Sequence, residues 1–325
     1  MPRTDKKTAR HYSNLLADVA EMYYLEGKIQ SEIAETVGVT RSMISRMLTE
    51  ARESGIVEIR IHRPMESDPE LTSALKERFG LMDALVITTR HRRGDGLTRA
   101  LGSAGARVLE RHLAPQKVLG LAWGTTISAT VDAFDADEPM PVSVVQLVGA
   151  MGARIMEYDG HDLISRMTEK LGGEAYYLNA PYLCDTAEIA ESLLHSVSIR
   201  ETINVGKRSD IALLGIGTTA PDFSSFYLAG YITRLELDDM RQAGAVGDVC
   251  GSHFDINGQP ACTDFSDRLV SMHRADLLAV PVRLGVAGGE GKADAILGAL
   301  CGKYVNVLVI DSRAAKKVLE LAESN

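Results

Sequence analysis

Short apolar runs alternate with amphipathic stretches of helical period along most of this chain, and this alternation narrows the choice of fold more than any other property of the sequence. The runs are apolar at consecutive residues, which is typical of strands buried on both faces of a parallel sheet. The stretches between them, such as Leu97–Leu113, His161–Leu171 and Glu290–Leu300, are typical of surface helices. The pattern predicts an α/β domain with a Rossmann-like parallel sheet and helices on both faces. We expect strands at Ala84–Thr88, Val118–Ala122, Val142–Val148, Ala175–Leu178, Ile211–Ile216, Leu277–Val282 and Val305–Ile310.

The length of 325 residues is too great for one compact core and suits two domains. Pro64 and Pro69 follow the alternating stretch Ile56–Ile61. Proline removes a backbone donor and restricts the residue before it, so this region is a plausible boundary. We therefore predict one domain over residues 1–63 and a second over residues 64–325.

The charge is unevenly distributed between these parts. Residues 1–64 hold ten Lys or Arg against nine Asp or Glu, whereas residues 65–325 hold 25 against 35. A chain with a net charge of −9 is not a general nucleic-acid binder. Any contact with DNA is expected only in the N-terminal part, where local basic groups meet phosphates.

Other classes are disfavoured by composition. The longest apolar run, Leu277–Val282, is far shorter than the roughly 20 residues that a membrane helix needs. The polar start leads into no apolar segment of a secretion signal, and the four cysteines form no C-x-x-C pair. We expect a cytoplasmic protein with no membrane partner, no cofactor and no metal site.

The N-terminal part has the pattern of a helix-turn-helix. Leu15, Leu16, Val19, Ala20 and Tyr23 form an apolar stripe at helical spacing, and a short second helix follows. Gly38 suits the left-handed end of that helix, and Thr40 suits the N-cap of a third. Val39 can pack on Ile44 as a hydrophobic staple, and the stretch Ile56–Ile61 would form a wing.

The second helix of such a unit fits the major groove of DNA and reads bases with residues near its N-terminus. Arginine donates to guanine or phosphate, and small serines allow close approach. The alternative is a small helical bundle with a solvated polar face, which the cap, staple and outward arginines together disfavour. The predicted DNA-binding residues are Gln30, Ser31, Thr40, Arg41, Ser42, Ser45 and Arg46.

Three segments carry a resemblance to a known family: Tyr23–Ala34, the loop Trp123-Gly-Thr-Thr126, and Val286-Ala-Gly-Gly-Glu-Gly-Lys-Ala-Asp-Ala-Ile296. Together they resemble the SorC family of bacterial sugar-responsive transcription regulators, of SorC/DeoR type. The resemblance runs from about Leu15 to Leu321. It implies a winged helix-turn-helix joined to an effector domain similar to sugar-phosphate isomerases, usually in a tetramer.

The loops that follow the strands are candidates for an effector site, because ligands collect beyond the carboxyl ends of parallel strands. Gly124, Thr125 and Thr126 stand between a strand and a helix, where both hydroxyls and several amides can converge on a phosphate. The alternative for these residues is a plain helix cap. The resemblance implies that the matching loop anchors the ligand phosphate.

Charged and amide side chains complete the expected site. Lys292 lies near a helix start after a Gly-rich turn, a position that the helix dipole disfavours unless an anion is near. Asp248 suits sugar hydroxyls, whereas Asp255 also fits a tight turn. Gln146, with Tyr158, is expected to line the same cavity. The resemblance supports Lys292 and Asp248 as ligand contacts; a surface lysine remains the alternative for Lys292.

Gly215-Ile-Gly-Thr-Thr-Ala220 has the form of a dinucleotide fingerprint, but Pro221 follows and no acidic residue ends a later strand, so we reject NAD binding. The sequence predicts an effector-responsive, DNA-binding transcriptional regulator of a carbohydrate or polyol catabolic operon. We expect the protein to be a repressor whose effector is a phosphorylated sugar or polyol and whose partner is operator DNA. We also expect it to form a homo-oligomer, namely a tetramer. The rival hypothesis is a sugar-phosphate isomerase-like enzyme with a carboxylate base.

Overall fold

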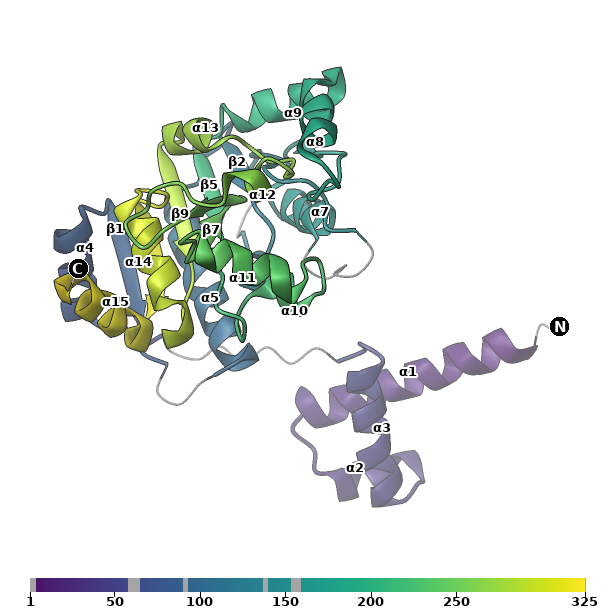
Figure 1. Cartoon of the computed structure of the whole chain (residues 1–325). Helices are drawn as coiled ribbons and strands as arrows, with labels where there is room; N and C mark the ends of the chain where they lie inside the picture. Colours follow the sequence, from purple (N-terminus) through teal and green to yellow (C-terminus); the bar gives the residue numbers. More distant parts are fainter. Residues whose placement is uncertain (1–3, 58–64, 90–92, 137–139, 153–158, 325) are drawn as a thin grey trace. The chain divides into compact units, whose positions relative to one another are not determined.

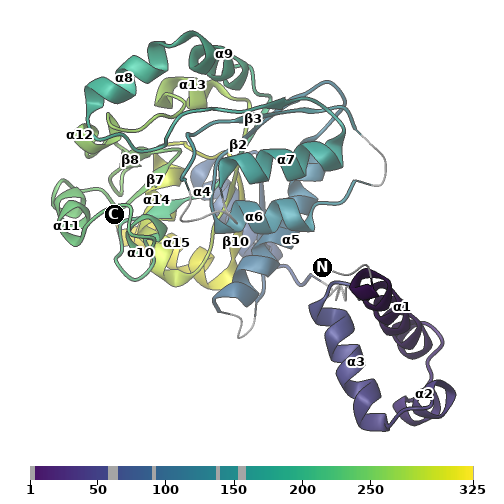
Figure 2. The same cartoon turned by 90° about the vertical axis from the view of Figure 1, so that its right-hand side faces the viewer.

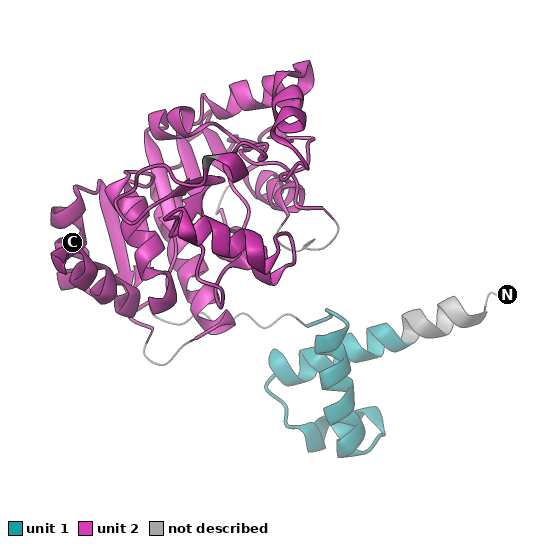
Figure 3. Ribbon diagram, in the orientation of Figure 1, with its two compact units in different colours: residues 1–64 teal, residues 65–325 magenta. Residues whose placement is uncertain are grey.

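The computed structural model describes residues 4–57, 65–89, 93–136, 140–152 and 159–324. The chain forms two compact units, residues 1–64 and residues 65–325 (Figure 3). Each unit has its own buried core. No helix in these described ranges is long and apolar enough to cross a membrane.

The first unit contains the three expected helices, α1 (Thr4–Tyr24), α2 (Gln30–Val37) and α3 (Arg41–Glu53). Gly38 ends α2 in the left-handed conformation with φ of 76°, and the Thr40 side chain caps α3 by accepting from the Met43 amide. Both predictions are confirmed. Ile44 is fully buried and Val39 packs against the same core, so the residues of the staple lie together as expected.

Two expectations for this unit need comment. Tyr23 does not belong to the core, since its side chain is 36% exposed and its ring meets Tyr24 edge to face. The core is complete without it, because Leu16, Val19 and Ala20 already fill the space against α3. The wing expected at Ile56–Ile61 falls largely on residues 58–64, which lie outside the described residues.

The second unit is built on a parallel sheet, which confirms the predicted α/β class. Within the described residues the sheet has seven strands in the order β1-β10-β9-β5-β2-β3-β4, and every neighbouring pair is parallel (Figure 1). Its strands are β1 (Asp83–Ile87), β2 (Val118–Leu121), β3 (Ser143–Gln146), β4 (Ala175–Tyr176), β5 (Ile211–Leu214), β9 (Val282–Val286) and β10 (Val307–Asp311).

One expected strand was misplaced. The run Leu277–Val282 does not form a strand, because residues up to Ala279 belong to helix α13 (Arg274–Ala279), and β9 begins only at Val282. The His273 side chain caps α13, and Leu277 is buried beneath it. Pro281, which has no amide to donate, separates the helix from the strand.

Helices cover both faces of the sheet, because alternate strand residues enter two separate cores. Helices α5 (Asp95–His112), α6 (Thr125–Ala133) and α7 (Gly160–Leu171) pack on one face (Figure 2). Helices α4 (Pro69–Phe79), α14 (Ala293–Cys301) and α15 (Ser312–Ser324) pack on the other. The remaining helices are α8 (Ala187–His195), α9 (Val197–Gly206), α10 (Ser225–Leu228), α11 (Arg234–Gln242), α12 (Thr263–Ser266) and the 3₁₀ turn η2 (Glu290–Lys292).

A small antiparallel sheet that the sequence did not predict stands beside the main one. It consists of β6 (Gly217–Thr218), β7 (Gly247–Val249) and β8 (Ser252–Phe254). Cys250 and Gly251 form the two-residue turn between β7 and β8, both with positive φ, which is the geometry of a type I′ hairpin. This sheet brings residues 217 and 248 into register.

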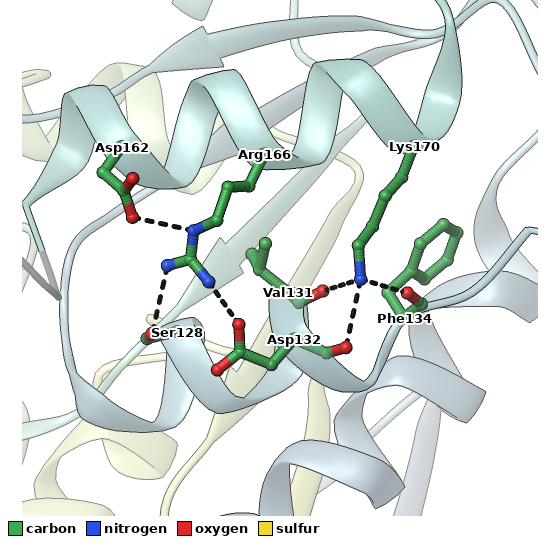
Figure 4. A network of polar contacts seen from close by, with 7 residues as sticks. All are labelled: Ser128, Val131, Asp132, Phe134, Asp162, Arg166 and Lys170. Atoms are coloured by element: carbon green, nitrogen blue, oxygen red, sulfur yellow. Dashed lines mark hydrogen bonds and ion pairs between the residues drawn. The ribbon is translucent and has the colours of Figure 1, made fainter. Parts of the chain in front are cut away.

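The C-terminal end of α6 is held by a lysine of α7 (Figure 4). Lys170 donates from Nζ to the carbonyls of Val131 at 2.8 Å, Asp132 at 3.0 Å and Phe134 at 2.6 Å. The Val131 and Asp132 carbonyls belong to the last turn of α6 and the Phe134 carbonyl to its C-cap residue, where no later amide of the helix can reach them. A cation at this end also opposes the negative end of the helix dipole.

Arg166, one turn earlier on α7, contacts the same helix. Its guanidinium pairs with Asp132 and, at 2.7 Å, with Asp162, and donates to the Ser128 hydroxyl at 3.2 Å (Figure 4). The two basic side chains therefore fix the position and direction of α6 against α7.

We expect Lys170→Met to lower the free energy of unfolding by about 1–2 kcal/mol, because three carbonyls lose a charged donor that is only partly exposed to water. Urea unfolding followed by circular dichroism measures the change. Lys317→Met is the matched control: its partner Glu320 is 66% exposed, so the loss should stay within about 0.5 kcal/mol. Equal effects of the two substitutions would show that the capping of α6 contributes nothing.

Candidate functional site

A pocket opens at the carboxyl ends of β2 and β5, which are neighbours at the centre of the sheet. The chain leaves β2 toward β3 on one side, and leaves β5 toward β9 on the other. Such a point, where the strand order reverses, is where open α/β sheets leave a crevice for ligands. Gly124, Thr125, Thr126, Asp248 and Lys292, all expected at the site, line this pocket.

The N-terminus of α6 forms one part of the pocket wall. Gly124 is the N-cap residue, with φ of 139° that side chains rarely tolerate, and it offers no side chain to cap the helix. The amide of Ser128 is the first to donate within the helix, to the carbonyl of Gly124 at 2.9 Å. The amides of residues 125–127 therefore have no acceptor within α6, and such a set of amides binds anions.

One of the two threonines uses its hydroxyl proton within the fold. The Thr126 hydroxyl donates its proton to the carbonyl of Val286 at 2.8 Å, so that proton is not available to a ligand. This bond instead ties the start of α6 to the end of β9. Thr125 is exposed at the pocket, and its hydroxyl remains the better candidate for a ligand contact.

Lys292 projects into the pocket from η2, at the junction with α14. Its Nζ donates to the carbonyl of Ile216 at 3.0 Å, which leaves two further protons on the ammonium group. Burial lowers the pKa of Lys292, and the nearby charge of Asp248 opposes that shift. An anion placed beside this ammonium would replace the water that it has lost.

Asp311 fixes the Gly-rich loop that precedes Lys292. Its buried carboxylate accepts from the amide of Gly289 at 2.6 Å, and from the amides of Arg313 at 3.1 Å and Ala314 at 3.3 Å. The same side chain therefore caps α15 and holds the loop, so the backbone that carries Lys292 is fixed before a ligand arrives.

Asp248 reaches the pocket from β7, directly opposite Gly217 of β6. Its Oδ2 accepts from the amide of Gly251 at 3.2 Å. A Cβ at residue 217 would overlap the Asp248 carboxylate, whereas a Cβ at Gly215 would have its nearest neighbour at 3.7 Å, in ordinary contact. The close approach of Asp248 thus requires glycine at position 217.

Three more ionisable residues line the pocket around Asp248. Burial raises the pKa of Tyr182 and of the Cys250 thiol, and the charge of Asp248 adds to both shifts. Burial lowers the pKa of His253, with Asp248 opposing. His253 also shares a hydrogen bond of 2.9 Å with the Ser266 hydroxyl. Near neutral pH these three groups are therefore uncharged.

Two expected site residues lie outside the pocket. Gln146 is buried below it, where its amide donates to the carbonyl of Val148 at 2.8 Å and accepts from the amide of Leu178 at 3.2 Å. Asp255 shapes a turn by accepting from the amides of Asn257 and Gln259. Their hydrogen bonds are used within the fold, so we withdraw both from the candidate site.

Tyr158 lies outside the described residues. No group of three or more potential metal ligands occurs in the part of the chain that the structure describes. His253 also lines the pocket.

The aromatic residues of the pocket were largely missed by the sequence analysis. Trp123 of the loop after β2 lies beside Tyr182 and Phe226, with ring centroids 6.0 and 6.1 Å away. Tyr182 and Phe226 are far from residue 123 in the sequence, and no local pattern marks them as pocket residues. The Trp-Gly-Thr-Thr loop was the available signal for Trp123.

Most of the predicted DNA-binding residues are exposed on the first unit. Arg41, Ser42, Ser45 and Arg46 are exposed on α3, opposite the buried Ile44, Met47, Leu48 and Ala51. Thr40 and Ser31 are exposed and Gln30 is half-buried, at the starts of α3 and α2.

Comparison with known proteins agrees with both parts of the chain. Residues 63–320 match the family described as "Putative sugar-binding domain". The deoxyribonucleoside regulator of Bacillus subtilis (strain 168) is 32% identical over 311 residues, which cover 95% of this chain and 98% of that protein. The sorbitol operon regulator of Klebsiella pneumoniae is 30% identical, over 94% and 98%. The crystal structure of this full-length regulator, SorC, matches with a TM-score of 0.72, 30% identity, and coverage of 94% of this chain and 99% of that one.

We expect Gly217→Ala to lower the free energy of unfolding by about 1–3 kcal/mol, because the added methyl group must displace the Asp248 carboxylate or separate β6 from β7. Thermal unfolding of the whole chain measures the effect. Gly215→Ala is the matched control, two residues away in the same pocket wall, and should change stability little. If both variants melt alike, the close approach at Gly217 does not constrain the fold.

Proposed function

The chain belongs to the SorC family of transcriptional regulators, and from this membership we propose that it controls a carbohydrate or polyol catabolic operon in response to a phosphorylated sugar or polyol. Like these relatives, it is a transcriptional regulator and not an enzyme. The alternative of a sugar-phosphate isomerase is set aside for that reason.

The observation that carries the proposal is the meeting of the α6 N-terminus and Lys292 in one pocket. Three amides without an acceptor in their own helix and a partly desolvated ammonium group both favour a negatively charged oxygen. A phosphate ester supplies several such oxygens, more than an unphosphorylated sugar can. We therefore assign the phosphate group of the effector to this part of the pocket.

Asp248 supplies a contact of the opposite kind. A carboxylate accepts hydrogen bonds from sugar hydroxyls and repels a phosphate. Because Gly217 and the turn at Cys250 hold Asp248 in place, its oxygens present a fixed set of acceptors. The effector then has its phosphate toward α6 and Lys292, and hydroxyl groups toward Asp248.

The first unit supplies the operator contact. α3 would enter the major groove and read bases through Arg41, Ser42, Ser45 and Arg46, while Thr40, Gln30 and Ser31 contact the backbone at the helix starts. A single head of this size buries little DNA, so we propose a homo-oligomer, as a tetramer, whose heads read repeated half-sites. A protein with this task works in the cytoplasm, where the DNA is.

The regulatory step is a shift between arrangements of the DNA-binding heads. The effector can drive it only through a different affinity for the two arrangements. We propose that the empty protein binds the operator and that the effector releases it, which makes the chain a repressor. Operator release by sugar phosphates in a gel shift tests this sign, and tighter binding with effector would reverse it.

We expect Arg46→Ala to weaken operator binding by about 1–3 kcal/mol, because it removes a base or phosphate contact from the outer face of α3. Gel shifts at fixed salt measure it, on a duplex selected from a random pool by the unaltered protein. Arg52→Ala is the matched control, since Arg52 is exposed in the last turn of the same helix, away from its N-terminus. Undiminished binding by the Arg46 variant would place base reading elsewhere on α3.

We expect Lys292→Met to weaken effector binding more than tenfold while the empty protein remains folded. Because burial lowers the pKa of Lys292, its charge is a cost to the empty fold, and the methionine retains much of the apolar stem. In the unaltered protein, raising the pH through this lowered pKa removes the cation, so binding should weaken there and not in the variant.

Calorimetric titration with the sugar phosphate that gives the largest thermal shift measures these effects. Lys316→Met, which changes an exposed lysine on α15, is the control. Affinity within twofold of the unaltered protein would show that Lys292 makes no ligand contact. Operator binding without effector should remain normal in both variants.

A further inference from the structure

We propose that the pocket selects the ring form of a phosphorylated sugar over an open-chain polyol phosphate, and that Trp123 is the residue that sets this preference. The inference rests on the proposed function and narrows its ligand class. It starts from the aromatic side chains that share the pocket with Lys292 and Asp248.

The indole of Trp123 is held in place from two sides. Tyr182 meets it edge to face, with 6.0 Å between ring centroids and 70° between planes. Phe226 of α10 lies at 6.1 Å with an interplanar angle of 32°. Tyr182 and Phe226 in turn contact each other at 5.5 Å. An aromatic group fixed before binding loses little conformational freedom when a ligand arrives.

The polar neighbours of this group show that it is more than core packing. Trp123 is the residue directly before Gly124, the N-cap of the helix whose amides are assigned to the phosphate, and both residues line the pocket. Tyr182 comes close to Asp248, whose charge raises the Tyr182 pKa, and its hydroxyl lies near Gly251, whose amide binds that carboxylate. Trp123 itself is only partly buried and lines the pocket. A ligand held by α6, Lys292 and Asp248 must therefore lie against aromatic carbon.

The chemistry of the two ligand forms differs at this contact. A sugar ring groups several C–H bonds on one face, and their slightly positive hydrogens suit the negative face of an aromatic ring. The ring is rigid, so it presents that face without further ordering. An open-chain polyol phosphate must freeze several rotatable bonds to present an equal face. The rigid aromatic wall therefore favours the ring.

Matched pairs of phosphates test the preference on the whole chain. Fructose 6-phosphate and its reduced open-chain counterpart, glucitol 6-phosphate, have the same carbon number and phosphate. Ribose 5-phosphate and ribitol 5-phosphate form a second pair. Because Trp123 is the only tryptophan in the sequence, its fluorescence reports binding next to the ring directly. We expect the unaltered protein to bind the ring member of at least one pair about tenfold or more tightly.

Variants separate this role from a structural one. Trp123→Phe keeps an aromatic face, whereas Trp123→Leu keeps only apolar volume. Measured by calorimetry, the ratio of dissociation constants within a pair should persist in the Phe variant and fall by about two- to tenfold in the Leu variant. A role in folding alone would weaken both members equally and leave the ratio unchanged. Phe226→Leu serves as a second test if Trp123→Leu does not fold, and should lower the ratio in the same direction.

Leu228→Ala is the control, because Leu228 is 64% exposed on α10 and is not among the pocket residues. An equal ratio in the unaltered and Leu proteins, or tighter binding of the polyol phosphates, overturns the inference while leaving the proposed phosphate site intact. If no phosphate of either pair, or of a wider panel, changes the fluorescence or melting temperature, the proposed function itself fails and the inference falls with it.

Discussion

The parallel pairing of β2 with β5 places every part of the candidate site. Leu119, Gly120 and Leu121 pair with Ile211, Ala212 and Leu213 at the middle of the sheet, although some 90 residues separate them in the chain. Because the chain turns away to opposite sides after these two strands, their carboxyl ends are left without a crossing helix. The loop at Trp123, the segment at Gly217 and the lysine after β9 can reach the same space only because this register holds.

The two ends of α6 show how packing prepares that space. At its C-terminus, Lys170 takes up the last carbonyls, and Arg166 binds the helix from the same side. At its N-terminus, a glycine stands where most helices have a capping side chain. The bond from Thr126 to Val286 fixes that open end against β9. Both ends of α6 are thus held in position, but only the backbone groups at its C-terminus have hydrogen-bond partners that cap the helix. The amides at its N-terminus are left to bind a ligand in the pocket.

Much of this arrangement could be predicted from the sequence, and the failures have physical causes. Runs such as Ile211–Leu214 are apolar at every residue, and this is the pattern of a strand that is buried on both faces of a parallel sheet. The run at Leu277 was misassigned because it is as apolar as a buried strand, although its first residues belong to a short helix. The cap of that helix, His273, is a weak signal in the sequence. Strands β6, β7 and β8 have two or three residues each, too few for any period to be visible.

The site shows the same limit more sharply. Gly124, Asp248 and Lys292 could be found from the sequence, because a glycine or a charged residue next to an apolar strand is unusual for a buried core position. Gln146 looked equally suitable, yet its side-chain amide is hydrogen-bonded to Val148 and Leu178. The bond to Leu178 joins residues 32 positions apart, so the local sequence does not reveal it. Tyr182 comes to the pocket for the converse reason: an isolated tyrosine in a loop acquires its place only when the sheet forms. Local sequence therefore marks residues with unusual backbone or charge, whereas the residues that shape a pocket by packing become visible only with the tertiary fold.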